Sequence, residues 1–420
     1  MYFSFKQIVL RQVYNILTHI AGFHLNIIGL FNKKLALGVK GRKETFKLIQ
    51  SKISDTDRTI WFHCASLGEY EQGLPVFEQI KANHPQHKIV LSFFSPSGYE
   101  IRKNNPIADC VVYLTLDTKQ NAKQFLDLVH PELVVFVKYE IWPNYLLEIK
   151  KRQINAILIS ALFRKNQSFF KSSGKWMQKA LFAFNHIFVQ NEESKQLLYK
   201  IGYEEATVSG DTRFDRVSNQ LNIDNSLEFI EAFKQNELCV VAGSTWPEDE
   251  TLLIDFINND VSDTKYIIAP HNIKSGQISN LKSKLTKATV LYSEKGSEGL
   301  SNVKVFIVDT IGLLSKIYSY ADIAYVGGAM GTTGLHNTLE PAVFGVPIII
   351  GNNHQKFPEA KAMIENKGMF SINNQEDFNT ILSQLINDTS FRIESGKLNA
   401  EYILKNKGAV SQIMSHLNKR

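Results

Sequence analysis

Cysteine, metal-binding motifs and nucleophile motifs are scarce or absent in this 420-residue chain. Three cysteines cannot build a disulfide framework and form no Cys-x-x-Cys pair, so a reducing compartment is favoured. Cys64, Cys110 and Cys239 each lie in an apolar run, and we expect them to be small buried side chains. No His-Glu-x-x-His motif and no cysteine–histidine cluster occurs, so no metal site is predicted. A Gly-x-Ser-x-Gly elbow is also missing, which weighs against a hydrolase of that kind.

The chain carries little net charge. Lys and Arg number 47 against 41 Asp and Glu, which gives a formal charge of +6. This surplus is too small to indicate a nucleic-acid partner, but it suits an anionic ligand or an anionic membrane surface. With 44% hydrophobic and 21% charged residues the composition is globular, and 420 residues are enough for two domains of ordinary size.

One long stretch has no charged residue at all, because positions 12–32 contain no Asp, Glu, Lys or Arg. It is long enough to span a bilayer, but four polar side chains interrupt it: Asn15, His19, His24 and Asn26. Basic residues flank it, namely Arg11, Lys33, Lys34, Lys40, Arg42 and Lys43. No small-residue cleavage site follows, so we do not expect a removed signal peptide. A buried amphipathic helix, an interfacial anchor and a spanning helix all fit, and we predict that residues 1–35 form a membrane-associating segment.

Beyond residue 58, short β-rich runs alternate with helical stretches, which is typical of parallel α/β folds. The first set of predicted strands covers residues 59–64, 88–93, 110–114, 133–137, 155–160, 186–189 and 207–209. The second set covers residues 238–243, 265–269, 289–292, 304–308, 323–327 and 347–350. Because these runs are almost continuously apolar, helices should bury both faces of each sheet. We therefore predict doubly wound domains over 36–220 and 238–400, a linker at 221–237 and a carboxy-terminal helix at 401–420.

In doubly wound folds ligands bind at the carboxyl ends of the strands, and two glutamates occupy such positions. Glu69 follows the first strand on a glycine-led turn at the start of a helix. It is either a helix-start acid that the helix dipole favours or a general base that accepts a proton from a hydroxyl. Glu140 follows the strand at 133–137 and precedes Trp142-Pro143. It either lines the same crevice as Glu69 or forms an ion pair with Lys138 or another base.

A strand, a glycine-rich loop and a helix start follow one another at residues 326–341. Four glycines lie in this loop, and glycines let a ligand approach the backbone while helix-start amides favour phosphate. The loop is neither a Walker loop nor a convincing dinucleotide fingerprint. Asn337 and Glu340 share one face of the first helical turn, where Glu340 could accept from two ribose hydroxyls. Alternatively, the pair forms a capping box with no ligand role.

Two further strand ends carry polar residues. Ser244 lies at a strand end before a proline-started helix, which is a workable anion site. His271 follows the strand at 265–269, where a surface or capping histidine is the alternative.

Together these segments resemble the 3-deoxy-D-manno-octulosonic acid (Kdo) transferases of lipopolysaccharide assembly, and among them a Bacteroidetes-like branch. The resemblance extends over residues 61–70, 136–143, 210–215, 243–250, 269–271, 309–314 and 326–359. Residues 63–69 are similar to the family's His-x-x-Ser-x-Gly-Glu segment, and residues 140–143 to its Glu-x-Trp-Pro element. It is their order and spacing, rather than any single motif, that is specific.

The resemblance implies a GT-B-type fold, with two Rossmann-like domains that face a cleft, and implies site residues in each domain. Glu69 would be the general base, and Glu140 would line the acceptor site. The residues that would bind the cytidine monophosphate (CMP) moiety are Ser244, Pro270, His271, Ile311, Gly312, Leu313, Asn337, Thr338, Leu339 and Glu340. Three positions depart from the family pattern: His271 replaces a frequent arginine, Leu313 a frequent acid and Leu335 a glycine.

The expected function is inverting transfer of Kdo from CMP-Kdo to a phosphorylated, lipid IVA-like precursor of lipid A. No metal and no cofactor is expected, and the expected location is the cytoplasmic face of the inner membrane. A GT-B-type nucleotide-sugar epimerase would share the fold and the ribose glutamate but act without a lipid. A non-catalytic lipid- or sugar-binding protein is the third alternative.

Overall fold

The computed structural model describes residues 5–171, 174–296 and 299–419, and the chain forms two compact units. The first unit comprises Met1–Arg216 and Gly408–Arg420, and the second comprises Val217–Lys407. The carboxy-terminal segment thus belongs to the same unit as the amino terminus, because α18 (Ala409–Leu417) packs against the first unit's core. Asp215 fixes the start of this helix by accepting hydrogen bonds from the backbone N–H groups of Gly408 and Ala409, at 2.9 and 3.1 Å.

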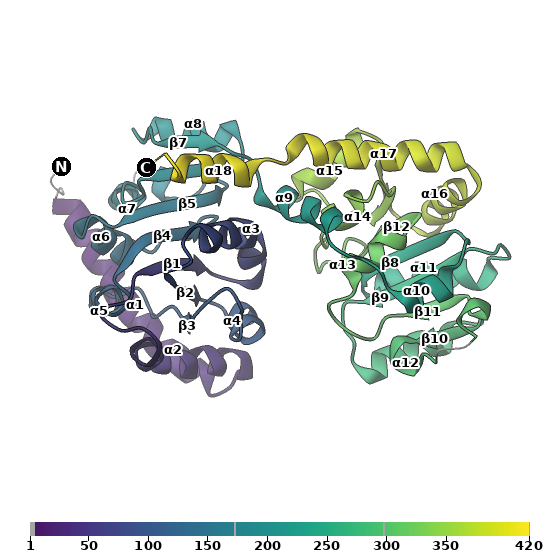
Figure 1. Cartoon of the computed structure of the whole chain (residues 1–420), viewed down its shortest axis with the longest axis horizontal. Coiled ribbons are helices and arrows are strands. Elements are labelled where there is room, and N and C mark those ends of the chain that lie inside the picture. The colour runs from purple at the N-terminus through teal and green to yellow at the C-terminus, as the bar shows by residue number, and fades with distance from the viewer. Residues whose placement is uncertain (1–4, 172–173, 297–298, 420) are drawn as a thin grey trace. The chain divides into compact units, whose positions relative to one another are not determined.

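A seven-stranded sheet forms the centre of the first unit, with the order β3-β2-β1-β4-β5-β6-β7 (Figure 1). All neighbouring strands are parallel. The strands are β1 (Thr59–Cys64), β2 (Lys88–Phe93), β3 (Cys110–Tyr113), β4 (Pro131–Val137), β5 (Asn155–Ala161), β6 (His186–Val189) and β7 (Ala206–Val208). The predicted strands are therefore present, with ends that differ by one or two residues.

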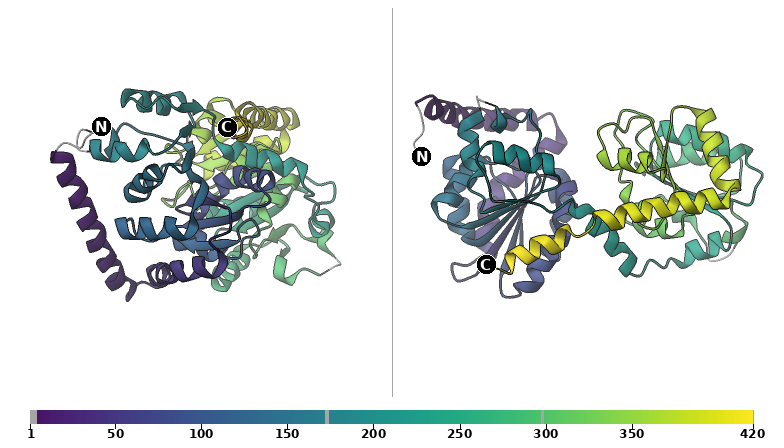
Figure 2. Two further views of the ribbon diagram at one scale, coloured as in Figure 1. Left: turned by 60° about the vertical axis from the view of Figure 1, so that its left-hand side comes forward. Right: turned by 90° about the horizontal axis from the view of Figure 1, so that it is seen from above.

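Helices bury both faces of this sheet, which explains why most strand residues are apolar (Figure 2). Successive strand residues alternate between the faces, so Trp61 joins one core and Phe62 the other. The first core contains residues from α2 (Lys33–Lys52), α5 (Lys119–Val129), α6 (Pro143–Lys151), α7 (Lys175–Leu181) and α8 (Glu192–Lys200). The second contains residues from α3 (Leu67–Asn83), α4 (Pro96–Arg102) and α18.

The uncharged stretch forms α1 (Phe5–Gly29), which runs along the outside of the first unit (Figure 2). Polar side chains hold it there: the Tyr14 hydroxyl donates to Oδ2 of Asp117 at 2.7 Å, and Asn144 donates to Asn15 at 2.9 Å. The opposite side of the helix and the turn after it expose apolar side chains, namely Val9, Val13, Ile16, Leu17, Ile20, Phe23, Ile27, Ile28, Leu30 and Phe31. Among the residues described, no helix combines the length and the apolarity that crossing a membrane requires.

The second unit repeats the architecture with the strand order β10-β11-β9-β8-β12-β13-β14, again fully parallel (Figure 1). The strands are β8 (Cys239–Thr245), β9 (Lys265–Pro270), β10 (Thr289–Leu291), β11 (Val305–Ile307), β12 (Ile323–Val326), β13 (Ile348–Gly351) and β14 (Met369–Ile372). Helices α11 (Pro247–Asn259), α12 (Ser275–Lys284) and α16 (Gln375–Asn387) supply one of its cores. The others are α10 (Glu228–Lys234), α13 (Leu314–Ile317), α14 (Leu339–Ala342), α15 (Pro358–Glu365) and α17 (Thr389–Asn406).

Two doubly wound sheets confirm the predicted fold class, and two local differences have physical causes. Strand β14 was not predicted, because this short edge strand includes Ser371 and has two half-buried positions. The stretch 221–237, predicted as a linker, contains α10, which buries Ile230 and Phe233 in the second unit. All three cysteines are free and buried, as expected. Helix α9 (Thr212–Asn219) crosses the boundary between the units.

Candidate functional site

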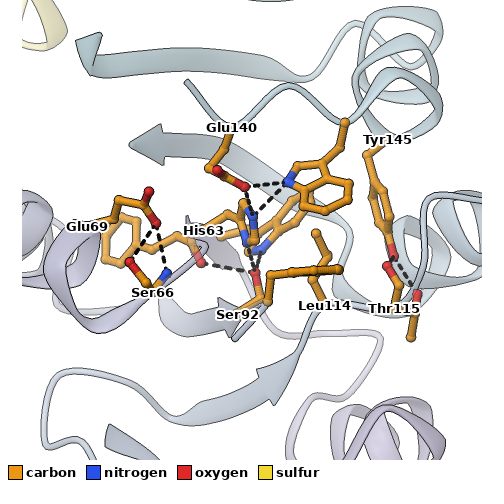
Figure 3. Close-up of polar contacts among 12 residues, drawn as sticks. His63, Ser66, Glu69, Ser92, Leu114, Thr115, Glu140 and Tyr145 are labelled. Carbon is orange, nitrogen blue, oxygen red and sulfur yellow. Dashed lines mark hydrogen bonds and ion pairs between the residues drawn. The ribbon is translucent and has the colours of Figure 1, made fainter. Parts of the chain in front are cut away.

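Glu69 lies in the first turn of α3, directly after β1 (Figure 3). Its Oε2 accepts hydrogen bonds from the backbone N–H of Ser66 at 2.8 Å and from the Ser66 hydroxyl at 3.2 Å. Glu69 therefore does stabilise the helix start. Its other oxygen, Oε1, has no hydrogen-bond partner in the described part of the chain, although the side chain is only 7% exposed. One carboxylate oxygen is thus held in place while the other can accept a proton.

The surroundings of Glu69 adjust its basicity. Burial raises the pKa of Glu69, and the negative charge of Glu140 raises it further. The Ser66 N–H bond and the charge of Lys138 act in the opposite direction, but the pKa remains above the usual range. A carboxylate is a better base when its pKa is closer to the working pH, so this shift suits general-base chemistry.

Glu140 lies at the end of the neighbouring strand, β4, where Lys138 turns the chain with a left-handed backbone, φ +66°. Its Oε2 accepts a hydrogen bond from the indole N–H of Trp142 at 2.9 Å and lies 3.5 Å from Nε2 of His63 (Figure 3). No ion pair between Glu140 and Lys138 occurs in the described structure, and the basic side chain that lies next to the Glu140 carboxylate is His63. The structure brings Glu69 and Glu140 to the carboxyl edge of the same sheet, as predicted.

Two residues without a predicted role, His63 and Ser92, lie beneath this pair. The β1–β2 register places them opposite each other, and Nδ1 of His63 is 2.9 Å from Oγ of Ser92. Ser92, His63 and Glu140 have the residue types of a hydrolase triad, but the Ser92 side chain is fully buried and accepts a hydrogen bond from Trp61. The arrangement cannot present Ser92 to a substrate. The only sequence signal for His63 was its place in the segment at residues 63–69.

In the second unit, the structure joins two of the predicted CMP-binding segments at Glu340. Its Oε1 accepts from Nδ2 of Asn337 at 3.0 Å, and its Oε2 accepts from the hydroxyl of Ser315 at 3.1 Å. Asn337 also accepts the N–H of Leu339 at 3.2 Å, but the helix begins after Thr338 and Glu340 accepts from side chains only, so the pair does not form the capping box given as the alternative. Ser315 follows the segment at residues 311–313 and was missed, because only the fold places it beside Glu340.

The remaining predicted CMP-binding positions differ in exposure. Thr338 and Leu339 have buried side chains, so only their main-chain atoms could meet a ligand. Ile311 is 82% exposed, and Gly312 is exposed with a left-handed φ of +90° and no atom near its Cβ position. Leu313 is half-buried.

Three rings gather at the carboxyl ends of β8, β9 and β12, which are neighbouring strands. The exposed His271 ring follows Pro270 and stacks on Trp246 with ring centroids 4.6 Å apart. His336, from the glycine-rich loop, lies 4.6 Å from His271 and accepts a 3.1 Å hydrogen bond from the Trp246 indole. Ser244 turns the chain at the end of β8 with φ +53°. Trp246 and His336 had no predicted role.

Within residues 5–171, 174–296 and 299–419, no three His, Cys, Asp or Glu side chains converge as a metal-binding group. The ligand contacts assigned to individual residues above stay predictions.

Comparison with known proteins shows which proteins the chain is similar to. Residues 40–216 match the family model described as 3-Deoxy-D-manno-octulosonic-acid transferase (kdotransferase). The 3-deoxy-D-manno-octulosonic acid transferase of Haemophilus influenzae is 25% identical over 85% of this chain and 86% of its own length. That of Aquifex aeolicus is 28% identical over 80% of this chain and 88% of its own length.

Among solved structures, the UDP-GlcNAc 2-epimerase of Neisseria meningitidis, bound to UDP-GlcNAc, has a TM-score of 0.61 at 13% identity. It covers 87% of this chain and the whole of its own, which shows a shared fold and confirms the GT-B-type architecture. The Bacteroidetes-like branch stays a prediction. From its sequence matches, the chain is a homologue of the 3-deoxy-D-manno-octulosonic acid transferases and carries a domain of that family in residues 40–216.

Proposed function

We propose that this protein is a glycosyltransferase of lipopolysaccharide biosynthesis that transfers Kdo from CMP-Kdo to a hydroxyl of a phosphorylated, lipid IVA-like precursor of lipid A. Its relationship to Kdo transferases supports the reaction class. The observation that carries the proposal is Glu69, a buried carboxylate with a raised pKa, one fixed oxygen and one oxygen without a protein partner among the described residues.

In the proposed reaction, Oε1 of Glu69 accepts the proton of the acceptor hydroxyl as the hydroxyl oxygen attacks the anomeric carbon of Kdo. The new C–O bond forms on the face opposite CMP, and the bond from the anomeric carbon to the phosphate oxygen breaks. The bonding electrons leave with CMP, so the configuration at the anomeric carbon inverts. Glu140 lines the acceptor site and keeps negative charge near Glu69, which favours proton uptake by the base.

The second unit would hold the CMP moiety. Glu340 is positioned by Asn337 and Ser315, and each of its oxygens has capacity for one more hydrogen bond from a ribose hydroxyl. The exposed Ile311 and Gly312 would frame the base, and Ser244 and His271 would face the phosphate. The proposal assigns no role to a metal ion or another cofactor.

We further propose that α1 places the enzyme on the cytoplasmic face of the inner membrane. Its exposed apolar side chains and the lysines that follow suit an anionic lipid surface. A lipid acceptor lies in that surface, so the anchor would keep enzyme and substrate together.

The test is release of CMP from CMP-Kdo by purified protein, with and without the lipid precursor. Glu69→Gln removes the base without changing the size of the side chain, so we expect turnover to fall about 100- to 10,000-fold while CMP affinity stays the same. Glu78→Gln, on an exposed position of the same helix, is the matched control and should keep wild-type turnover. Near-normal turnover in Glu69→Gln would overturn the assignment, and loss of CMP binding would recast Glu69 as a donor ligand.

A nucleotide-sugar epimerase is the second candidate, because the fold is shared with a UDP-GlcNAc 2-epimerase. An epimerase would convert its nucleotide sugar without any lipid. Turnover that depends on the lipid precursor therefore separates the two functions.

A further inference from the structure

A continuous set of hydrogen bonds, buried at Ser92 and partly buried at Trp142, connects the core of the first unit to Glu140 (Figure 3). The indole N–H of Trp61 donates to Oγ of Ser92 at 2.7 Å, and Ser92 lies 2.9 Å from Nδ1 of His63. On the other side of the imidazole, the indole N–H of Trp142 lies 3.0 Å from Nε2 of His63 and 2.9 Å from Oε2 of Glu140. His63 is completely buried, so it can reach a substrate only through these neighbours.

The donors and acceptors of this set allow one consistent assignment for a neutral imidazole. Trp142 can donate only, so Nε2 of His63 must accept, and the ring proton is on Nδ1. Nδ1–H then donates to Ser92, which also accepts from Trp61 and can donate its own proton to the carbonyl of Phe62 at 3.4 Å. Each group is satisfied, as buried polar groups require.

The Trp142 indole is held from two directions. Phe94 packs against it with ring centroids 4.6 Å apart, and the guanidinium of Arg42 covers Phe94 at 4.4 Å. These contacts fix where the indole lies, while the hydrogen bond to His63 fixes where its N–H points. The same N–H also donates to Glu140. The imidazole of His63 therefore helps to orient the N–H group to which the Glu140 carboxylate is hydrogen-bonded.

We propose that His63 is a positioning residue, which fixes the carboxylate of Glu140 near Glu69 through the indole N–H of Trp142. This inference rests on the proposed function, in which Glu69 is the base. It assigns a task to a buried histidine that touches no substrate. The task is to keep the second carboxylate in place so that its charge acts on Glu69.

Loss of this positioning should change the base as well as the rate. The charge of Glu140 raises the pKa of Glu69, so a Glu140 side chain that turns away should let that pKa fall. Below its pKa a general base is protonated and inactive. The acid limb of the pH–rate profile should therefore move to lower pH when His63 no longer holds Trp142.

Two substitutions of His63 distinguish the role of its Nε2 atom from the role of its Nδ1 atom. The amide of His63→Gln can reach the Nε2 position and accept from Trp142, whereas the amide of His63→Asn can reach only the Nδ1 position, beside Ser92. We expect His63→Gln to stay close to wild type. We expect His63→Asn to lower kcat/KM about 10- to 100-fold, as for a misplaced active-site group, and to move the acid limb downwards.

Two further variants test whether a general loss of stability, rather than loss of the hydrogen bond, explains the effect of His63→Asn. Trp142→Phe removes the shared N–H directly and should behave like His63→Asn, with no further loss when the two are combined. Tyr145→Phe removes a buried 2.6 Å hydrogen bond to Thr115 in the same core, which Figure 3 also shows, and is the matched structural control. It should leave the pH profile unchanged.

The pKa of Glu69 is measured independently of turnover by ¹³C NMR titration of the side-chain carboxyls in the full-length protein, with Glu69→Gln used to assign the signal. A lower Glu69 pKa in His63→Asn and Trp142→Phe, but not in His63→Gln or Tyr145→Phe, supports the positioning role. An unchanged pKa in His63→Asn, or equal losses in His63→Asn and His63→Gln, would overturn it. If Glu69→Gln keeps normal turnover while the NMR pattern holds, the assignment of the base fails and the positioning role stands.

Discussion

The indole N–H of Trp246 donates a 3.1 Å hydrogen bond to Nε2 of His336, which joins the loop after β8 to the loop after β12. Burial and, to a smaller extent, the neighbouring His271 lower the pKa of His336 to about 4. The partial desolvation of the His271 ring also lowers its pKa, so both rings are mainly uncharged at neutral pH. The second unit has one arginine, Arg392, and its guanidinium donates to main-chain carbonyls beside α17. The proposed phosphate site therefore has no fixed arginine charge.

This arrangement predicts that CMP binding depends on pH through His271. A bound phosphate favours the charged imidazole and raises the His271 pKa in the complex. Binding is then tightest at low pH and weakens as the pH rises through the pKa of the complex, by at most about tenfold per unit for one proton. Calorimetric titration between pH 6 and 8 measures this trend. His271→Arg carries its charge throughout and should bind more tightly at pH 8, with a flatter profile. Because the titration of CMP itself is common to both proteins, identical profiles would contradict the prediction.

Asp249 is predicted to hold the two loops of the second unit together. Its fully buried carboxylate accepts from the backbone N–H groups of Trp246 and Gly328, both at 2.9 Å, and from the Tyr325 hydroxyl at 2.7 Å. Asp249→Ala leaves three donors without a partner and should lower the free energy of unfolding by about 3–5 kcal/mol. Denaturant unfolding measures the loss. The exposed Asp255 in the same helix is the control, and Asp255→Asn should stay within about 0.5 kcal/mol of wild type.

The exposed face of α1 is predicted to bind anionic lipid. Leu17 and Phe23 are 56% and 66% exposed, so replacing both with glutamine should leave the fold intact. The loss of apolar area should weaken binding on the order of 10- to 100-fold. Sedimentation with phosphatidylglycerol-containing vesicles gives the partition coefficient. The apolar control is Ile101, which is 59% exposed on α4, and Ile101→Gln should not change partitioning. Equal binding by the double variant and the wild type would place the membrane contact elsewhere.

The amino-acid pattern predicted most strands of both sheets, but it missed one edge strand and one helix outside the sheets. Strands such as β1 and β2 are buried at nearly every position because helices cover both of their faces, and their mostly apolar residues are a clear signal in the sequence. Edge strand β14 is covered less, and its signal is correspondingly weak. Helix α10 lies in a polar stretch where Ile230 and Phe233 alone are buried, so a linker was predicted instead.

The candidate site was predictable where it follows from strand ends. Glu69 and Glu140 each follow a buried strand, and parallel strands bring such positions to one edge. The contact between His63 and Ser92 could not be predicted from the sequence, because it depends on the register between β1 and β2. Ser315 and Glu340 are 25 residues apart, and only the folded loops bring them to 3.1 Å.

Sequence alone thus determined two doubly wound sheets and the edge at which polar residues gather, because the alternation of apolar runs with helices is a local property of the chain. The tertiary structure determined which groups surround each of these polar residues. The pKa of Glu69, the orientation of Glu140 and the neutral state of His336 all depend on burial and on partners distant in the chain. Desolvation and charge interactions act through space over a few ångströms, so only the folded coordinates specify them.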